Sequence, residues 1–289
     1  MTSWRVVIVT RILPVALGLI ETVRSAGHEP VALLTIRAEN RYGDEFTLDA
    51  LLNGVPQELD VLLPARRSSI APLLASVRPD VVVCMGFPWK IPADALAVPR
   101  LGWLNGHPSL LPRHRGPIPV AWAIRNGDPA IGLTVHRMDP ELDTGPILAQ
   151  TTIEIGEYVG PDEFYPRVGP LVMGLMGEAL AKLGAGEEGV VQEGGEYESF
   201  FTDEDAWLDV LRPAEELHRI VWAWRYAMSR GELRGALAKI DGETVRVLAS
   251  SLVEVEGAQR VECGDGPLWL VQTEPADVQA TAGEAVASA

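Results

Sequence analysis

Residues 5–27 of the sequence read RVVIVTRILPVALGLIETVRSAG. The first part, residues 5–10, holds the continuous apolar run Val6–Val9 and is predicted to form a fully buried strand. Residues 15–26 then carry apolar side chains at helical spacing, until Gly27 and His28 stop the pattern. A buried strand followed directly by a helix is the opening of a βαβ unit, so this stretch predicts a parallel sheet covered by helices.

The same alternation continues along the N-terminal part of the chain. Further β-rich runs lie at residues 31–35, 61–63, 81–85, 101–105 and 132–136, with helical candidates between several of them. This pattern predicts an α/β fold with a Rossmann-like, mostly parallel sheet and helices on both faces. Functional residues are expected beyond the carboxyl ends of strands, after Met85, Leu104 and Val135. The first turn, residues 11–14, lacks G-x-G-x-x-G, which disfavours a dinucleotide cofactor.

The C-terminal part of the chain has a different organisation. Residues 164–183 predict a long helix, and the glycine-rich stretch 184–195 indicates a linker. Residues 213–230 predict a second helix, and short β-rich runs follow at residues 236–240, 244–251, 252–255, 260–263 and 268–272. We therefore expect an α/β domain at residues 1–200, a helix with a small OB-like β-barrel at 201–273, and a disordered tail at 274–289.

Composition narrows the classes of function. The 289 residues include 24 Lys+Arg and 40 Asp+Glu, so the net charge of −16 leans against nucleic acid as the main partner. A hydrophobic fraction of 47% predicts a packed core, and no apolar stretch is long enough for a signal peptide or a membrane span. We expect a soluble, cytoplasmic protein. The two cysteines, Cys84 and Cys263, form no metal or redox motif, which predicts reduced thiols and no metal site.

One polar constellation points to chemistry. Trp103, Asn105 and His107 alternate along a predicted strand and share one face, and Asp143 follows a neighbouring strand. An amide donor, a titratable imidazole and a carboxylate that converge on one pocket suit the transfer of an acyl group to an amine. The amide can stabilise a developing oxyanion, the imidazole can supply a donor or a proton, and the carboxylate can help to deprotonate an ammonium nucleophile.

The spacing alone leaves a purely structural reading open. Asn105 and His107 also fit a strand-ending turn whose side chains cap the loop backbone, and Asp143 fits a turn residue. His136 is expected on the wall of the cleft or as a satisfied, half-buried histidine, whereas Arg113 and Arg115 fit either a solvated loop or contacts with a ligand carboxylate. Three further histidines are expected at the surface: His28, His114 and His218.

Four motifs in order carry a resemblance to a known family. Residues 105–112 read NGHPSLLP, Arg115-Gly116 follows, residues 122–127 read WAIRNG, and residues 143–147 read DTGPI. Together they closely resemble the signature of the folate-dependent formyltransferase superfamily, which includes methionyl-tRNA, glycinamide ribonucleotide, amino-sugar and hydroxyornithine formyltransferases. The resemblance covers roughly residues 1–200. More weakly, residues 205–272 resemble the terminal barrel of methionyl-tRNA formyltransferases.

The resemblance implies roles for individual residues. It makes Asn105, His107 and Asp143 the catalytic set of a transferase that uses 10-formyltetrahydrofolate as formyl donor and needs no metal. It also implies that the donor is held by one loop, by a turn that lines the pterin pocket, and by a segment that closes the other side. The residues so implied are Ser109, Leu110, Leu111 and Pro112 for the loop, Met85, Gly86, Phe87, Trp89 and Ile91 for the turn, and Asp139 and Leu142 for the closing segment.

The acceptor amine is less well specified. The terminal barrel favours methionyl-tRNA, but residues 205–274 hold eight basic and twelve acidic residues, and residues 36–51 lack the basic insertion typical of such enzymes. Trp222 and Trp224 fit core packing better than a base-stacking platform. We therefore favour a small amine, such as an amino sugar or a hydroxylated ornithine.

Two other classes of function stay open at this point. A hydrolase that gives the formyl group to water would need a regulatory domain that has no visible counterpart here. A non-catalytic folate-binding protein would not need an intact set of Asn105, His107 and Asp143. The sequence predicts no oligomeric state.

Overall fold

The computed structural model describes residues 2–37, 47–154, 160–227, 235–240 and 242–276. The chain divides into two compact units, the first formed by residues 1–119 and 129–198 and the second by residues 120–128 and 199–289. The short segment 120–128 therefore belongs to the second unit although it lies within the N-terminal part of the sequence. Across the described ranges, every helix is too short or too polar to cross a membrane.

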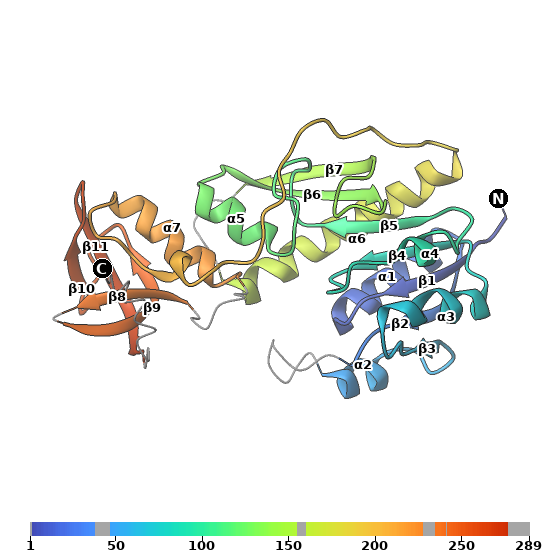
Figure 1. Cartoon of the computed structure of the whole chain (residues 1–289), viewed down its shortest axis with the longest axis horizontal. Helices are drawn as coiled ribbons and strands as arrows, with labels where there is room; N and C mark the ends of the chain where they lie inside the picture. The colour runs from blue at the N-terminus through green and yellow to red at the C-terminus, as the bar shows by residue number, and fades with distance from the viewer. Residues whose placement is uncertain (1, 38–46, 155–159, 228–234, 241, 277–289) are drawn as a thin grey trace, which may run out of the picture. The chain divides into compact units, whose positions relative to one another are not determined.

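The first unit is built on a seven-stranded sheet in the order β3-β2-β1-β4-β5-β6-β7 (Figure 1). The strands are β1 (Arg5–Val9), β2 (Glu29–Leu34), β3 (Asp60–Leu62), β4 (Val81–Met85), β5 (Trp103–His107), β6 (Ala130–Arg137) and β7 (Ile147–Glu154). The first five are parallel, and β6 and β7 are antiparallel additions at one edge. The predicted α/β class is confirmed, although the sequence pattern did not identify β7.

Helices cover both faces of this sheet. They are α1 (Leu13–Ser25), α2 (Leu48–Gly54), α3 (Ile70–Val77), α4 (Ala93–Leu96) and α6 (Pro161–Gly184), with a 3-10 turn η2 (Arg67–Ser69) before α3. Helices α1 and α6 contact each other over one face, and α3 and α4 contact each other over the opposite face. The helix predicted over residues 164–183 is confirmed as α6, which begins three residues earlier.

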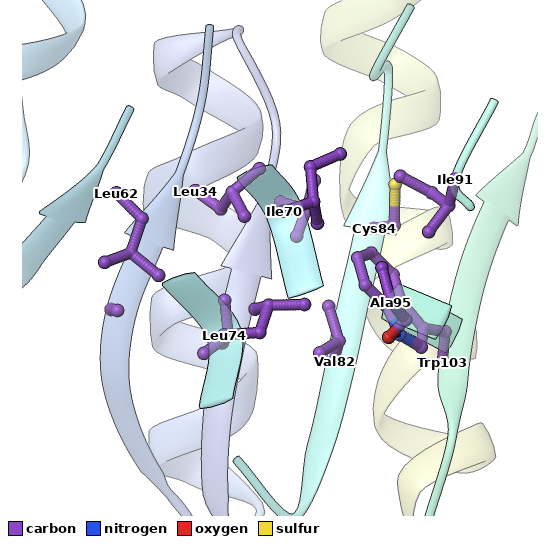
Figure 2. Close-up of a cluster of buried hydrophobic side chains, with 12 residues drawn as sticks. Leu34, Leu62, Ile70, Leu74, Val82, Cys84, Ile91, Ala95 and Trp103 are labelled. Atoms are coloured by element: carbon purple, nitrogen blue, oxygen red, sulfur yellow. Dashed lines mark hydrogen bonds between the residues drawn. The ribbon is translucent and has the colours of Figure 1, made fainter. Parts of the chain in front are cut away.

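Strand alternation explains the core beneath α3 and α4. Figure 2 shows Leu34 of β2 and Val82 of β4 near Ile70 and Leu74 of α3, and Trp103 of β5 beside Ala95 of α4. Because successive side chains of a strand point to opposite faces, only every second residue of β1, β2, β4 and β5 enters this cluster. The remaining residues of these strands, such as Val6 and Ile8, are also fully buried, because the other face of the sheet is covered as well.

The order of the strands also locates the site. β1 lies between β2 and β4, so the chain changes direction across the sheet at the β1/β4 pair. In sheets of this kind, ligands bind beyond the carboxyl ends of the strands near such a switch point. Asn105 and His107, at the end of β5 next to β4, therefore lie close to the position where chemistry is expected.

The second unit combines two helices with a four-stranded antiparallel sheet. The helices are α5 (Pro119–Asn126, of which 120–126 lie in this unit) and α7 (Ala214–Trp224), with a 3-10 turn η3 (Glu204–Ala206). The strands are β8 (Ala236–Ile240), β9 (Glu243–Ser251), β10 (Gln259–Glu262) and β11 (Pro267–Pro275), in the order β10-β11-β9-β8. The sheet curls into half of a barrel, in line with the predicted small barrel.

Three details of the second unit differ from the sequence predictions. Residues 252–255 form the connection between β9 and β10 rather than a strand, and Leu252 and Val253 are exposed there. The helix predicted over 213–230 ends at Trp224, and residues 228–230 lie outside the described part. The predicted disordered tail begins inside β11, which continues to Pro275, while residues 277–289 lie outside the described part.

The tryptophans of α7 show why core packing was the better interpretation. Trp224 is 7% exposed, its indole N–H donates to the carbonyl of Asp205 at 3.0 Å, and its ring meets Phe201 edge to face at 5.1 Å. Trp222 is half-buried, with the Arg225 guanidinium 4.7 Å from its ring centre. A base-stacking platform needs open ring faces, and Trp224 does not offer one.

Candidate active site

Asn105 lies in β5, directly opposite His136 of β6. Residues that face each other in an antiparallel pair point to the same side of the sheet, so the two side chains meet. The Nδ2 atom of Asn105 lies 3.2 Å from Nε2 of His136, and it also lies 3.5 Å from Oδ1 of Asp143. The ring of His136 contacts the carbonyl of Arg137 through Nδ1 at 2.8 Å. Because a carbonyl only accepts, Nδ1 carries the proton and leaves Nε2 as the acceptor for the Asn105 amide.

Asp143 lies in the loop between β6 and β7. Its φ of 59° is left-handed, a conformation that aspartate adopts more readily than most residues. Oδ1 lies 3.8 Å from Nδ1 of His107 and 3.6 Å from Nε2 of His136, and Oδ2 accepts from the backbone N–H of Gly116 at 3.0 Å. The structure thus brings Asn105, His107 and Asp143 together, as the sequence predicted, from one strand and a loop.

His107 ends β5 and is buried, with 6% of its surface exposed. Its Nε2 atom lies 3.0 Å from the backbone carbonyl of His114. That contact requires a proton on Nε2, so the Nδ1 atom that faces Asp143 is the nitrogen that can take up or release a second proton.

Burial and the neighbouring charges have opposing effects on the pKa values of His107 and Asp143. Burial lowers the pKa of His107 below its usual value of 6.5, against the opposing effect of the Asp143 carboxylate. Burial by itself raises the pKa of Asp143, but His107, His136 and the Gly116 amide together lower it to about 2. At neutral pH the site therefore holds an ionised carboxylate beside a neutral imidazole, a pairing suited to proton transfer.

The loop from Ser109 to Pro112 folds onto β6. The hydroxyl of Thr134 donates to the carbonyl of Ser109 at 2.7 Å, and Gln150 donates to the carbonyl of Leu111 at 3.0 Å. The side chains of Ser109 and Leu111 are buried, whereas Leu110 and Pro112 are half-buried. Side chains that can meet a ligand are thus those of Leu110 and Pro112, and the role of this loop in donor binding stays a prediction.

The predicted pterin segments also come together. Phe87, Trp89 and Met138 pack against the same hydrophobic cluster, and Lys90 pairs with Glu141 at 3.3 Å. Ile91 is buried within that cluster, and the backbone of Gly86 at the end of β4 is exposed. A half-buried aromatic wall beside an exposed backbone fits a flat, polar-edged ring such as a pterin.

The loop that would close this pocket is held by its own hydrogen bonds. Oδ1 of Asp139 accepts from the hydroxyl of Thr144 at 2.7 Å and from the N–H of Glu141 at 3.1 Å. Leu142 is exposed at the tip, and Met85 is half-buried at the end of β4. The residues present therefore fit a folate donor, and their individual roles stay predictions.

Several residues lie in or behind the site that the sequence reasoning placed elsewhere. His114 is 6% exposed rather than at the surface, because its Nδ1 atom lies 2.6 Å from the carboxylate of Glu198. Arg115 is bound by Gln192 rather than solvated, and the amide of Gln192 donates to the backbone carbonyls of Asp143 and Gly145. No local pattern indicated these partners, since Gln192 and Glu198 lie more than 75 residues after the loop that they hold.

The other two histidines are half-buried rather than exposed. His28 stacks on Trp4 with a ring separation of 4.3 Å, and His218 lies 2.9 Å from the hydroxyl of Ser250. Both belong to packing outside this site.

Comparisons with known proteins agree with this geometry. Residues 63–173 match the family model described as "Formyl transferase". A methionyl-tRNA formyltransferase from Rhizobium meliloti is 32% identical over 286 residues, which cover 91% of this chain and 88% of that protein. Methionyl-tRNA formyltransferases of Pseudomonas species are similar over shorter alignments, which span 65% to 74% of their own length.

Solved structures show the same fold at lower sequence identity. A sugar N-formyltransferase from Shewanella has a TM-score of 0.63 at 22% identity, covering 86% of this chain and 99% of that one. HypX from Aquifex aeolicus, in complex with tetrahydrofolic acid, has a TM-score of 0.65 at 18% identity and covers 95% and 44%. From the Rhizobium relative and the matched family model, we conclude that this chain belongs to the formyltransferase family.

Proposed function

We propose that this enzyme transfers the formyl group of 10-formyltetrahydrofolate to the amine of a small biosynthetic metabolite, such as an amino sugar or a hydroxylated ornithine. The observation that carries the choice of acceptor is the pairing of charges in the second unit. Five of its arginines lie within ion-pair distance of a carboxylate, as Arg125–Asp205, Arg212–Glu216, Arg219–Glu215, Arg246–Glu274 and Arg260–Glu262.

Paired arginines make a poor surface for tRNA. Binding of a nucleic acid gains its free energy largely when unpaired basic side chains displace counterions from phosphates. Here the carboxylates already neutralise the guanidinium groups, and the whole chain carries a net charge of −16. The same negative field attracts a small amine, which is cationic before it reacts.

The donor supplies an activated formyl group, and the side chains of this chain supply binding and proton transfer. The Nδ2 atom of Asn105 carries two N–H groups and lies 3.2 Å from Nε2 of His136 and 3.5 Å from Oδ1 of Asp143, so the contact with Asp143 is the longer and weaker one. The N–H that makes this weaker contact is therefore available to a formyl oxygen on which negative charge develops.

Asp143 and His107 are the two groups that can take up the proton of the acceptor amine. The ionised carboxylate of Asp143 can take a proton from an ammonium group, which cannot attack while it is protonated. Nδ1 of His107, 3.8 Å from that carboxylate, can share this proton and then act as a second donor beside Asn105.

A second acceptor is supported by one specific observation. The Rhizobium methionyl-tRNA formyltransferase matches over 91% of this chain, a span long enough to reach into both units. Initiator methionyl-tRNA therefore belongs in the same assay as the small amines.

The experiment measures tetrahydrofolate released from 10-formyltetrahydrofolate with each acceptor in turn. We expect turnover with at least one small amine, little turnover with initiator methionyl-tRNA, and loss of turnover in Asp143→Ala. Asp162→Asn, which removes an exposed carboxylate in the first turn of α6, is the matched control and should be as active as the wild type. Efficient formylation of the tRNA with no small amine accepted would overturn the proposal.

A further inference from the structure

The loop at residues 114–116 touches two members of the proposed catalytic set. The backbone carbonyl of His114 lies 3.0 Å from Nε2 of His107, and the backbone N–H of Gly116 donates to Asp143 at 3.0 Å. Two backbone groups that are two residues apart thus hold an imidazole and a carboxylate that come from different elements. The position of this loop decides the geometry of both.

The loop itself is held by residues that follow α6. Tyr197 forms a parallel β-bridge with Arg115, and the N–H of Glu198 donates to the carbonyl of Arg115 at 2.8 Å. The carboxylate of Glu198 lies 2.6 Å from Nδ1 of His114, whose side chain is buried. Charge-assisted hydrogen bonds of this length are among the stronger polar contacts in proteins.

The conformation of His114 explains why a strong side-chain contact is needed there. Its φ of 55° is left-handed, a conformation that a non-glycine residue adopts only against a steric penalty. That conformation turns the carbonyl of His114 towards His107, while the Glu198 carboxylate holds the side chain in place. A left-handed residue beside a reacting group persists when its surroundings overdetermine it.

We propose that Glu198 and His114 form a positioning pair that sets the tautomer of His107. The carbonyl of His114 keeps the proton of neutral His107 on Nε2, and the lone pair on Nδ1 therefore faces Asp143. Without the pair the carbonyl is free to turn away, and His107 can then carry its single proton on either nitrogen. This inference rests on the proposed function in one respect, since it matters for turnover only if His107 acts in formyl transfer.

The test combines kinetics with nitrogen-15 NMR of the histidine rings. The chain has five histidines, so each ring can be assigned from single variants, and His107→Gln identifies the signals of His107. We expect the wild type to show the Nε2–H tautomer of His107 and Glu198→Ala to show a mixture of both tautomers. In Glu198→Ala, kcat should fall about 10- to 100-fold, while KM for the donor stays within about 3-fold.

Two variants separate positioning from a general structural role. Glu198→Gln retains an oxygen that can accept from Nδ1 of His114, and it should restore the Nε2–H tautomer and most of kcat. Glu196→Ala removes an exposed carboxylate two residues away and should match the wild type in both measurements. If Glu198→Ala does not fold, Glu198→Asp, which retracts the carboxylate by one methylene, takes its place with the same expected direction.

An unchanged tautomer and unchanged kcat in the folded Glu198→Ala variant would overturn this proposal. The NMR measurement does not depend on turnover, so it remains informative whatever the acceptor is. Failure of the proposed function would be recognised separately, as full activity of Asp143→Ala.

Discussion

Asn105 and His136 are direct cross-strand partners, and the Nδ2 atom of Asn105 lies 3.2 Å from Nε2 of His136. The contact orients the amide that is proposed to meet the formyl oxygen. Since Nδ1 of His136 contacts the carbonyl of Arg137, His136 has one nitrogen left to accept from Asn105. We therefore expect His136 to act as a positioning residue for Asn105, although it lies outside the set indicated by the sequence motifs.

Replacing His136 should misorient Asn105. In His136→Phe the ring is retained but the acceptor is lost, so the Asn105 amide is free to turn towards Asp143. We expect kcat to fall about 10- to 100-fold with little change in KM for the donor, because an oxyanion donor acts mainly in the transition state. Steady-state formyl transfer measures this, and His28→Phe, which alters a histidine stacked on Trp4 away from the site, is the control. Wild-type kcat in His136→Phe would show that Asn105 needs no such partner.

Removing the charge of Asp143 should abolish turnover and leave the fold intact. Asp143→Asn preserves the size of the side chain but cannot accept the proton of an ammonium group. We expect kcat/KM to fall at least about 100-fold, with circular dichroism unchanged. The deficit should be smaller for an acceptor whose amine has a low pKa, since less of it must be deprotonated. A deficit independent of acceptor pKa would argue that Asp143 only orients His107.

Gly132 is required by the close approach of the loop from Ser109 to Pro112. A Cβ atom at this position would lie 1.9 Å from the backbone nitrogen of Leu110. Gly132→Ala should therefore lower the free energy of unfolding by about 2–4 kcal/mol or displace the loop and raise KM for the donor. Gly174→Ala lies in α6 with open space around its Cβ, and it should stabilise the protein by up to about 1 kcal/mol. Equal melting temperatures of the two variants would contradict this reading.

The second unit should become less stable in mild acid because the half-buried imidazole of His218 must then be protonated. Burial lowers the pKa of this imidazole to about 4, against the opposing effect of Glu215, whereas its ordinary value is 6.5. The unfolded chain therefore binds the proton more tightly than the folded one between these values. Stability is fully present above pH 6.5 and is lost as the pH falls towards 4, by about 1–2 kcal/mol after allowance for solvent screening.

Denaturant unfolding at several pH values measures this loss. His218→Gln has no titratable group at this position and should flatten the part of the pH dependence between 6.5 and 4. Burial also lowers the pKa of His28, which belongs to the first unit. His28→Gln is therefore the variant with which the pH dependence of His218→Gln is compared. A dependence that is the same in wild type and His218→Gln would assign the acid sensitivity to other groups.

Strands with continuous apolar runs were predicted well because they are buried on both faces. β1 and β4 consist largely of valine and isoleucine, and such β-branched residues favour strands over helices. β7 escaped detection because its second half alternates between half-buried and exposed residues, and no continuous apolar run marks it. Residues 252–255 gave the opposite error, since Leu252 and Val253 are apolar but exposed in a connection.

Local sequence by itself determined the α/β fold, the strand that carries Asn105 and His107, and the family to which the chain belongs. These features depend on period, spacing and short motifs, which are properties of contiguous residues. Tertiary structure alone decided that His136 faces Asn105, that His114 is buried against Glu198, and that Gln192 holds the loop of Asp143. Each of these contacts joins residues more than 30 positions apart, and a polar side chain reveals its partner only once the sheet has set which strands and loops are neighbours.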